Sequence, residues 1–246
     1  MKTFRLQMIL MLLFFTGASL VSAQDLQPSY GIGMDISNLH VQSIVQDSVG
    51  YIWMATSRGL NRIDAYKKSC FYFHTSSGSS LSDDNTYFLH VSSKGELLVF
   101  TRFSVDLFNR FSGSFTRLRG PVGEFNFTCA EDGRDGRIWL GCRTFNYLSY
   151  VDRRKDRIYS LYIPQLKGQI SGICCDDKGM LWLSLGQRRG TVVFNPYRDR
   201  IIARYPDLSV VFRGPEKNQL FALMSNKAIV LFNSGTRRVT KRLLTE

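Results

Sequence analysis

The sequence lacks several features that would assign it to a common functional class. Its five cysteines show no Cys-x-x-Cys spacing of the kind that binds zinc, and no loop alternates Asp and Asn in the manner of a calcium site. Although 32 basic residues face 20 acidic ones, Lys and Arg form only pairs and triplets such as Arg153-Arg154-Lys155. We therefore expect the cations to be spread over strand surfaces, and we expect no nucleic acid partner, no metal and no cofactor.

Helical periodicity and long apolar runs are missing from all but the N-terminus. There Lys2 and Arg5 precede an apolar segment from Leu6 to Phe15, and Val21-Ser22-Ala23 follows. This order predicts a cleavable secretory signal over residues 1–23 and an exported mature chain without a membrane span. The alternative is an uncleaved anchor, but the apolar segment is shorter than the ~20 residues that a spanning helix needs.

The cysteine count limits the covalent cross-links. Export permits disulfides, yet an odd number leaves at least one thiol unpaired in the monomer. Cys129 is expected at the repeat position of Ile44 and Ile173, which would make it a small buried hydrophobe. We expect thiols in the core, with at most one disulfide, among Cys70, Cys129, Cys142, Cys174 and Cys175.

What the sequence does contain is an internal repeat. Trp53, Trp139 and Trp182 each stand three residues after a glycine, and Leu98 and Phe221 occupy the same register in two weaker copies. The five positions are 39 to 45 residues apart. That interval is the size of a four-stranded propeller blade.

Each unit reads as four short strands separated by turn residues. A turn precedes the Trp strand, and we expect Asp47, Asp132 and Asp176 at one position of that turn, bonded to the backbone. The sequence therefore predicts an all-β fold, a β-propeller of five four-stranded blades. The expected blades cover residues 36–80, 81–121, 122–165, 166–207 and 208–246.

The tryptophans have two interpretations. Exposed aromatic rings can stack on sugars, but these three recur at one place in the second strand, where neighbouring blades pack together. We expect Trp53, Trp139 and Trp182 to be core residues.

The string from Ile44 to Asp64 resembles the propeller repeat of two-component regulators, and the segment from Phe73 to Asp83 resembles that family's inter-blade segment. The resemblance implies the periplasmic sensor of a hybrid two-component system of gut Bacteroidetes. In such receptors two seven-bladed propellers precede a β-sandwich, a membrane helix and a histidine kinase. They detect oligosaccharides and switch on polysaccharide-utilisation genes.

The sequence departs from that pattern. No kinase motif, phosphoacceptor module or later membrane helix is recognised, and five blades are fewer than seven. We expect an incomplete arc of a seven-bladed propeller from a longer receptor, with a closed five-bladed propeller as the alternative. A homodimer is compatible with the resemblance.

Two other functional classes are alternatives to a ligand sensor. One is an exported scaffold that binds a partner protein through one propeller face. The other is a carbohydrate-active enzyme, which would need paired carboxylates at converging loops. Asp83-Asp84 and Asp176-Asp177 are pairs within single loops, so we expect no catalytic residues.

The loop between the second and third strands of each blade carries a cation. In propellers this loop lies on the same face as the connection to the next blade, so the cations are expected along one rim. Because arginine binds carboxylate and sulfate bidentately, the rim would suit an acidic oligosaccharide. The alternative is that these loops are merely polar. The predicted ligand-binding residues are Arg58, Arg102, Arg143, Arg188, Arg189 and Lys227.

Overall fold

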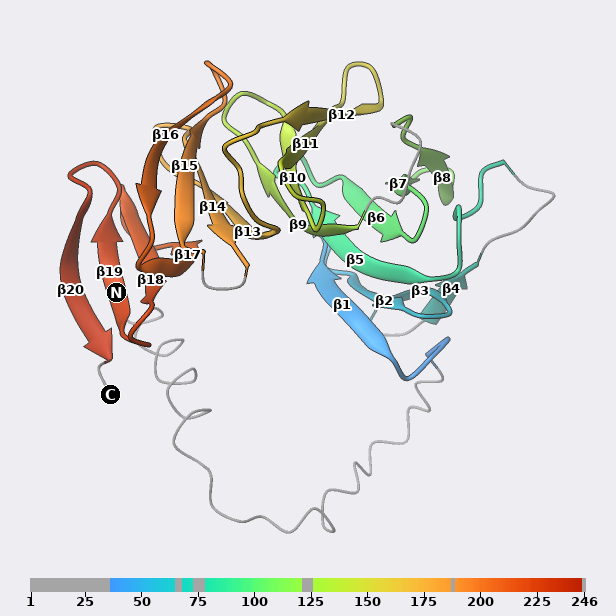
Figure 1. Cartoon of the computed structure of the whole chain (residues 1–246). Coiled ribbons are helices and arrows are strands. Elements are labelled where there is room, and N and C mark those ends of the chain that lie inside the picture. Colours follow the sequence, from blue (N-terminus) through green and yellow to red (C-terminus); the bar gives the residue numbers. More distant parts are fainter. Residues whose placement is uncertain (1–35, 65–67, 73–77, 121–125, 187–188, 245–246) are drawn as a thin grey trace, which may run out of the picture. The chain divides into compact units, whose positions relative to one another are not determined.

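The structure, a computed structural model, describes residues 36–64, 68–72, 78–120, 126–186 and 189–244. The predicted signal, residues 1–23, lies outside them. Across the described residues the chain forms twenty strands in five antiparallel sheets of four strands each, with no helix (Figure 1). Within this part of the chain, no helix long and apolar enough to span a membrane is found. The predicted all-β class is confirmed.

Each sheet consists of four consecutive strands that pair in chain order. The first and second sheets contain β1 Val41–Gln46, β2 Ile52–Thr56, β3 Gly59–Ile63 and β4 Lys68–Phe71, then β5 Thr86–Val91, β6 Leu97–Thr101, β7 Val105–Asn109 and β8 Ser114–Arg117. The third contains β9 Phe127–Asp132, β10 Ile138–Cys142, β11 Tyr147–Asp152 and β12 Arg157–Tyr162. The fourth and fifth contain β13 Ile170–Cys175, β14 Leu181–Leu185, β15 Thr191–Asn195 and β16 Arg200–Tyr205, then β17 Leu208–Arg213, β18 Gln219–Met224, β19 Ile229–Asn233 and β20 Arg238–Leu244.

The sheets meet along their first strands. β1 contacts β5, β5 contacts β9, β9 contacts β13, and β13 contacts β17. Among the described elements, no comparable contact joins the fifth sheet to the first. Each sheet is thus one blade of a β-propeller, and the predicted fold of five four-stranded blades is confirmed over these residues.

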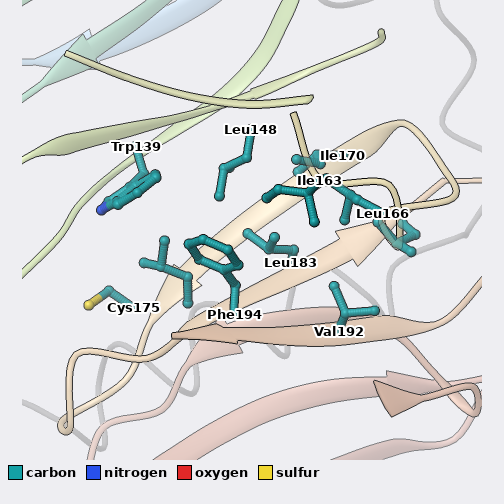
Figure 2. Packing of buried hydrophobic residues seen from close by; sticks show 11 residues of the cluster. Trp139, Leu148, Ile163, Leu166, Ile170, Cys175, Leu183, Val192 and Phe194 are labelled. Atoms are coloured by element: carbon teal, nitrogen blue, oxygen red, sulfur yellow. The ribbon is translucent and has the colours of Figure 1, made fainter. Parts of the chain in front are cut away.

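The Trp register explains how one sheet packs on the next. Trp53, Trp139 and Trp182 are at most 1% exposed, and Leu98 in the second sheet is equally buried. Trp139, for example, belongs to a cluster with Leu183 and Phe194 of the fourth sheet, and Figure 2 shows its ring directed toward them. The three tryptophans are therefore core residues, as predicted, and burial excludes them as a sugar-stacking surface.

A carboxylate locks the turn before the Trp strand. Asp47 Oδ2 accepts a hydrogen bond from Trp53 Nε1 at 2.9 Å, and Asp176 Oδ2 accepts one from Trp182 Nε1 at 3.0 Å. The other oxygen of each accepts backbone amides of the same turn. The glycine that closes each of these two turns has a positive φ, +103° and +75° respectively, which glycine adopts without a steric cost.

The expectation for Asp132 was wrong. The amide that begins the equivalent turn of the third sheet belongs to Gly133, which donates to Arg137 O as Asp47 donates to Tyr51 O. Asp135 takes the role of the acid there, with its Oδ1 3.4 Å from Trp139 Nε1. Asp132 instead lies at the end of β9, where Oδ2 is 3.1 Å from His90 Nε2.

A similar shift of one residue affects Cys129. It pairs with Gly141, whereas Ala130 pairs with Leu140 as Ile44 pairs with Met54 and Ile173 with Leu183. All five cysteines lie in the described residues and are free thiols. Burial raises the pKa of Cys129 to about 11 and that of Cys174 to about 12, so these thiols stay protonated at neutral pH.

Candidate functional site

One edge of the five sheets carries both the connections between sheets and the loops between second and third strands. We call it the connection edge, and the described residues of its loops are 57–58, 102–104, 143–146, 186, 189–190 and 225–228. In every sheet an amide of this loop donates to the carbonyl of the residue directly before the first strand. The five pairs, with distances of 2.8 to 3.3 Å, are Ser57–His40, Arg102–Asn85, Arg143–Asn126, Gly186–Gln169 and Ser225–Asp207.

This repeated bond places the predicted cations. Arg58, Arg102, Arg143, Arg189 and Lys227 are exposed on the connection edge, while Arg188 lies outside the described residues. Arg102 and Arg143 are themselves the residues whose amides make the repeated bond. Arg58, Lys227 and Arg189 follow that position by one, two and three residues, so the charges share an edge but not one register.

Aromatic rings orient two of these guanidinium groups. The guanidinium carbon of Arg102 lies 5.2 Å from the centre of the Phe103 ring, and that of Arg189 lies 5.9 Å from the Phe145 ring. Arg189 Nη1 also donates to Lys167 O at 2.9 Å. Because Phe145 belongs to the third sheet and Arg189 to the fourth, this contact joins two loops of the edge.

The first strands are bulged at this same edge. In each sheet the pairing of the first and second strands slips at the second residue of the first strand. A bulge leaves its extra residue unpaired and redirects that side chain. The five bulged residues all have polar hydrogen-bonding groups: Gln42, Tyr87, Thr128, Ser171 and Ser209.

Three of the bulged side chains reach the next sheet. Gln42 Nε2 lies 3.4 Å from Asn85 Oδ1, Tyr87 Oη accepts the amide of Phe127 at 3.2 Å, and Thr128 Oγ1 donates to Ile170 O. Burial raises the pKa of Tyr87 to about 12, against the opposing effects of the Phe127 amide and the charge of Arg143. The phenol is therefore neutral at physiological pH. The charge of Arg143, a predicted site residue, acts on it by favouring its ionised form.

Aromatic residues at the connection edge were missed in the sequence. Phe103, Phe145, Tyr147 and Tyr162 are all exposed on it, with Phe103 at 57%. Phe103 also lines a cavity of about 420 Å³ between the second and third sheets, together with the buried side chains of Val105, Leu118 and Ile158. That volume is within the range of small-ligand pockets. The sequence does contain a signal for some of them. Phe103 directly follows Arg102, and Phe145 and Tyr147 follow Arg143 by two and four residues.

The acidic pairs considered for catalysis have structural partners. Asp83 Oδ1 accepts the amide of Asn85 at 2.7 Å. Asp177 pairs with Arg134 at 2.9 Å, and the hydrogen bond from the Asn218 amide lowers the pKa of its carboxyl. Asp176 holds the turn described above, so these carboxylates join sheets or close turns.

A half-buried carboxylate lies at the opposite end of the first strands. Glu131 Oε1 accepts the amide of Cys175 at 3.1 Å, which links the third and fourth sheets. Burial raises the pKa of Glu131, and the Cys175 amide, Arg213 and His90 oppose this only in part. The folded state then binds this proton more tightly than the unfolded state, so the stability that the protonated carboxyl contributes is lost as pH rises through the folded pKa.

We expect Glu131→Gln to raise the Tm at pH 7, because the amide avoids the burial of charge and still offers an acceptor to Cys175. The difference from wild type should shrink as pH falls toward the unfolded value of about 4.3. Thermal unfolding at several pH values measures this, with the exposed Glu216→Gln as control. A lower Tm for Glu131→Gln at pH 7 would show that attraction to Arg213 outweighs burial.

Comparisons with known proteins agree with the fold. Residues 35–58 match the family model described as two component regulator propeller, which confirms the resemblance over that segment. The extracellular domain of the putative hybrid two component system BT3049 from B. thetaiotaomicron is 19% identical, with a TM-score of 0.65; the alignment covers 83% of this chain but 30% of that one. No curated protein matches the chain.

Other solved structures share the fold. A catalytically inactive virginiamycin B lyase from Staphylococcus aureus with quinupristin is 14% identical, with a TM-score of 0.67, and 87% of this chain and 73% of that chain are covered. A protein of unknown function from Bacteroides caccae is 14% identical, with a TM-score of 0.53 and coverage of 82% and 81%. The extracellular domain of a putative hybrid two component system and a lyase thus share this fold, and the fold alone does not distinguish a binding function from a catalytic one.

Proposed function

We propose that this chain is the ligand-binding propeller portion of a hybrid two-component receptor, exported to the periplasm, which detects an oligosaccharide. In this proposal the connection edge binds the ligand without chemical change, and an acidic oligosaccharide is the preferred class. The repeat that matches the two component regulator propeller model supports the receptor assignment. The signal-like N-terminus supports export.

The observation that carries the proposal is the repeated amide-to-carbonyl bond of the five loops. It holds a cation of every sheet on one edge, although the surrounding loop sequences differ. Clustered arginines attract carboxylate and sulfate groups and can bind them through paired hydrogen bonds. Asp83, a carboxylate near this edge, accepts the backbone amide of Asn85 at 2.7 Å and so has a structural role.

We expect Arg58→Ala and Arg143→Ala each to weaken the binding of acidic oligosaccharides by roughly tenfold, the effect of about 1.4 kcal/mol. Titration calorimetry with uronate and sulfated oligosaccharides, and with neutral ones of the same length, measures this. Raising the salt from about 0.1 to about 1 M shortens the Debye length from about 10 to about 3 Å and should weaken binding further.

Arg154→Ala is the matched control, because Arg154 is exposed in the turn between β11 and β12 at the opposite edge. It removes the same charge and should leave the Kd unchanged. Equal binding of neutral sugars, unaffected by Arg58→Ala and Arg143→Ala, would overturn the acidic-ligand assignment. Turnover of the sugar during titration would overturn the sensor assignment.

A further inference from the structure

Several exposed aromatic residues lie at the connection edge of the third sheet. Of eight aromatic side chains that are exposed among the described residues, three gather there: Phe145 at 46%, Tyr147 at 37% and Tyr162 at 61%. Tyr147 and Tyr162 are cross-strand partners of β11 and β12, and their ring centres are 5.4 Å apart at an interplanar angle of 57°. Large aromatic groups left in water this way commonly mark a binding surface.

The backbone fixes this loop from both sides. Asn146 has a left-handed φ of +65°, a conformation that asparagine tolerates better than most residues. Its amide donates to Leu166 O at 3.1 Å, and its carbonyl accepts the amide of Ile163 at 2.7 Å. The backbone that carries Phe145 and Tyr147 is consequently held in place before a ligand arrives, which lowers the entropy cost of binding.

Two cations belong to the same part of the edge. Arg143 begins the loop, and Arg189 of the fourth sheet lies over Phe145 while its Nη1 is bonded to Lys167 O. An apolar ring face and a positive charge therefore meet at Phe145 and Arg189. A sugar with an acidic substituent matches both, because its C–H face packs on an aromatic ring while its anionic group pairs with arginine.

We infer that Phe145, Tyr147 and Tyr162, flanked by Arg143 and Arg189, form a platform that stacks one ring of the ligand. We call it the third-sheet platform. The inference rests on the proposed function and deepens it, since it names the ligand as an oligosaccharide bearing a uronate or sulfate group next to a sugar ring with an apolar face. Tyr162, the most exposed of the three, provides the outer stacking surface.

The test is titration of the full chain with a panel of oligogalacturonate, oligomannuronate, chondroitin sulfate and dermatan sulfate hexasaccharides. For the tightest binder, Tyr162→Ala is expected to raise the Kd about tenfold, as for a central aromatic contact. Tyr162→Phe keeps the ring and should stay within about twofold of wild type. Phe111→Ala is the control, because Phe111 is 95% exposed in the turn between β7 and β8 at the opposite edge.

The outcomes separate the two proposals. If a panel member binds and Arg143→Ala weakens it but Tyr162→Ala leaves the Kd unchanged, the platform is wrong and the proposed function stands. If no member binds, both fail. If Tyr162→Phe weakens binding as much as Tyr162→Ala, the hydroxyl rather than ring stacking is responsible, and the platform is again wrong. Unchanged melting curves for the variants show that the fold is intact in each comparison.

Discussion

Replacing Trp139 by alanine is expected to lower the free energy of unfolding by about 3–5 kcal/mol, the range for large aromatic residues in a core. Trp139 is fully buried between the third and fourth sheets. Its ring centre is 5.8 Å from that of Phe194 in an edge-on arrangement, and the Arg137 guanidinium lies 4.4 Å from its ring. The cavity left by the indole cannot collapse easily, because two sheets meet around it (Figure 2).

Urea unfolding followed by circular dichroism measures this change, and a lower midpoint with an unaltered slope would show a loss of stability alone. Phe111→Ala removes an aromatic that is almost fully exposed and should have little effect. Variant protein that remains folded should bind ligand as wild type does. If Trp139→Ala kept its stability but lost binding, the indole would belong to the ligand site and the core assignment would be wrong.

Removing the carboxylate of Asp176 is the second large effect, expected to cost about 3 kcal/mol. Asp176 is only 4% exposed, and its Oδ1 accepts the amides of Lys178 and Met180, both at 2.9 Å. Its Oδ2 accepts a hydrogen bond from Nε1 of the buried Trp182 indole. Alanine leaves these donors without an acceptor, and a buried unsatisfied donor loses its full solvation energy.

Asp47→Ala tests the physical cause. Asp47 makes the corresponding bonds, including one from Trp53 Nε1, and one more from the Gly50 amide, but it lies in a more exposed turn. Water can replace part of what is lost there, so we expect a smaller loss of stability than for Asp176→Ala. Chemical denaturation of both variants compares them directly. An equal loss at the two sites would show that burial does not decide the cost.

The repeat could be predicted because it is local in sequence. A glycine three residues before Trp53, Trp139 and Trp182 marks a turn and the strand after it, and both features depend on neighbouring residues. The errors at Asp132 and Cys129 came from matching residue types rather than counting back from the Trp. Asp47 and Asp176 stand six residues before the Trp of their sheets, whereas Asp132 stands seven before Trp139.

The candidate site could be predicted in part. The cations of the connection edge followed from propeller topology, and the repeated loop bonds place the described ones there. The bulges at Gln42, Tyr87, Thr128, Ser171 and Ser209 were not predicted, because only one strand residue precedes each of them and there is no alternation for the extra residue to interrupt. The third-sheet platform was missed since Tyr147 and Tyr162 are 15 residues apart and meet only by strand pairing.

The sequence by itself determined the class of fold, the number of repeats, and which large side chains lie in the core, because the period of about forty residues and the alternation within strands act over short distances. Only the tertiary structure decided which rings and charges share a surface. Phe145 and Arg189 belong to different sheets, and Tyr162 reaches Tyr147 through the pairing of β11 with β12. The first contact depends on how the sheets stack and the second on which strands pair, and both are set by the sum of many contacts rather than by any one segment.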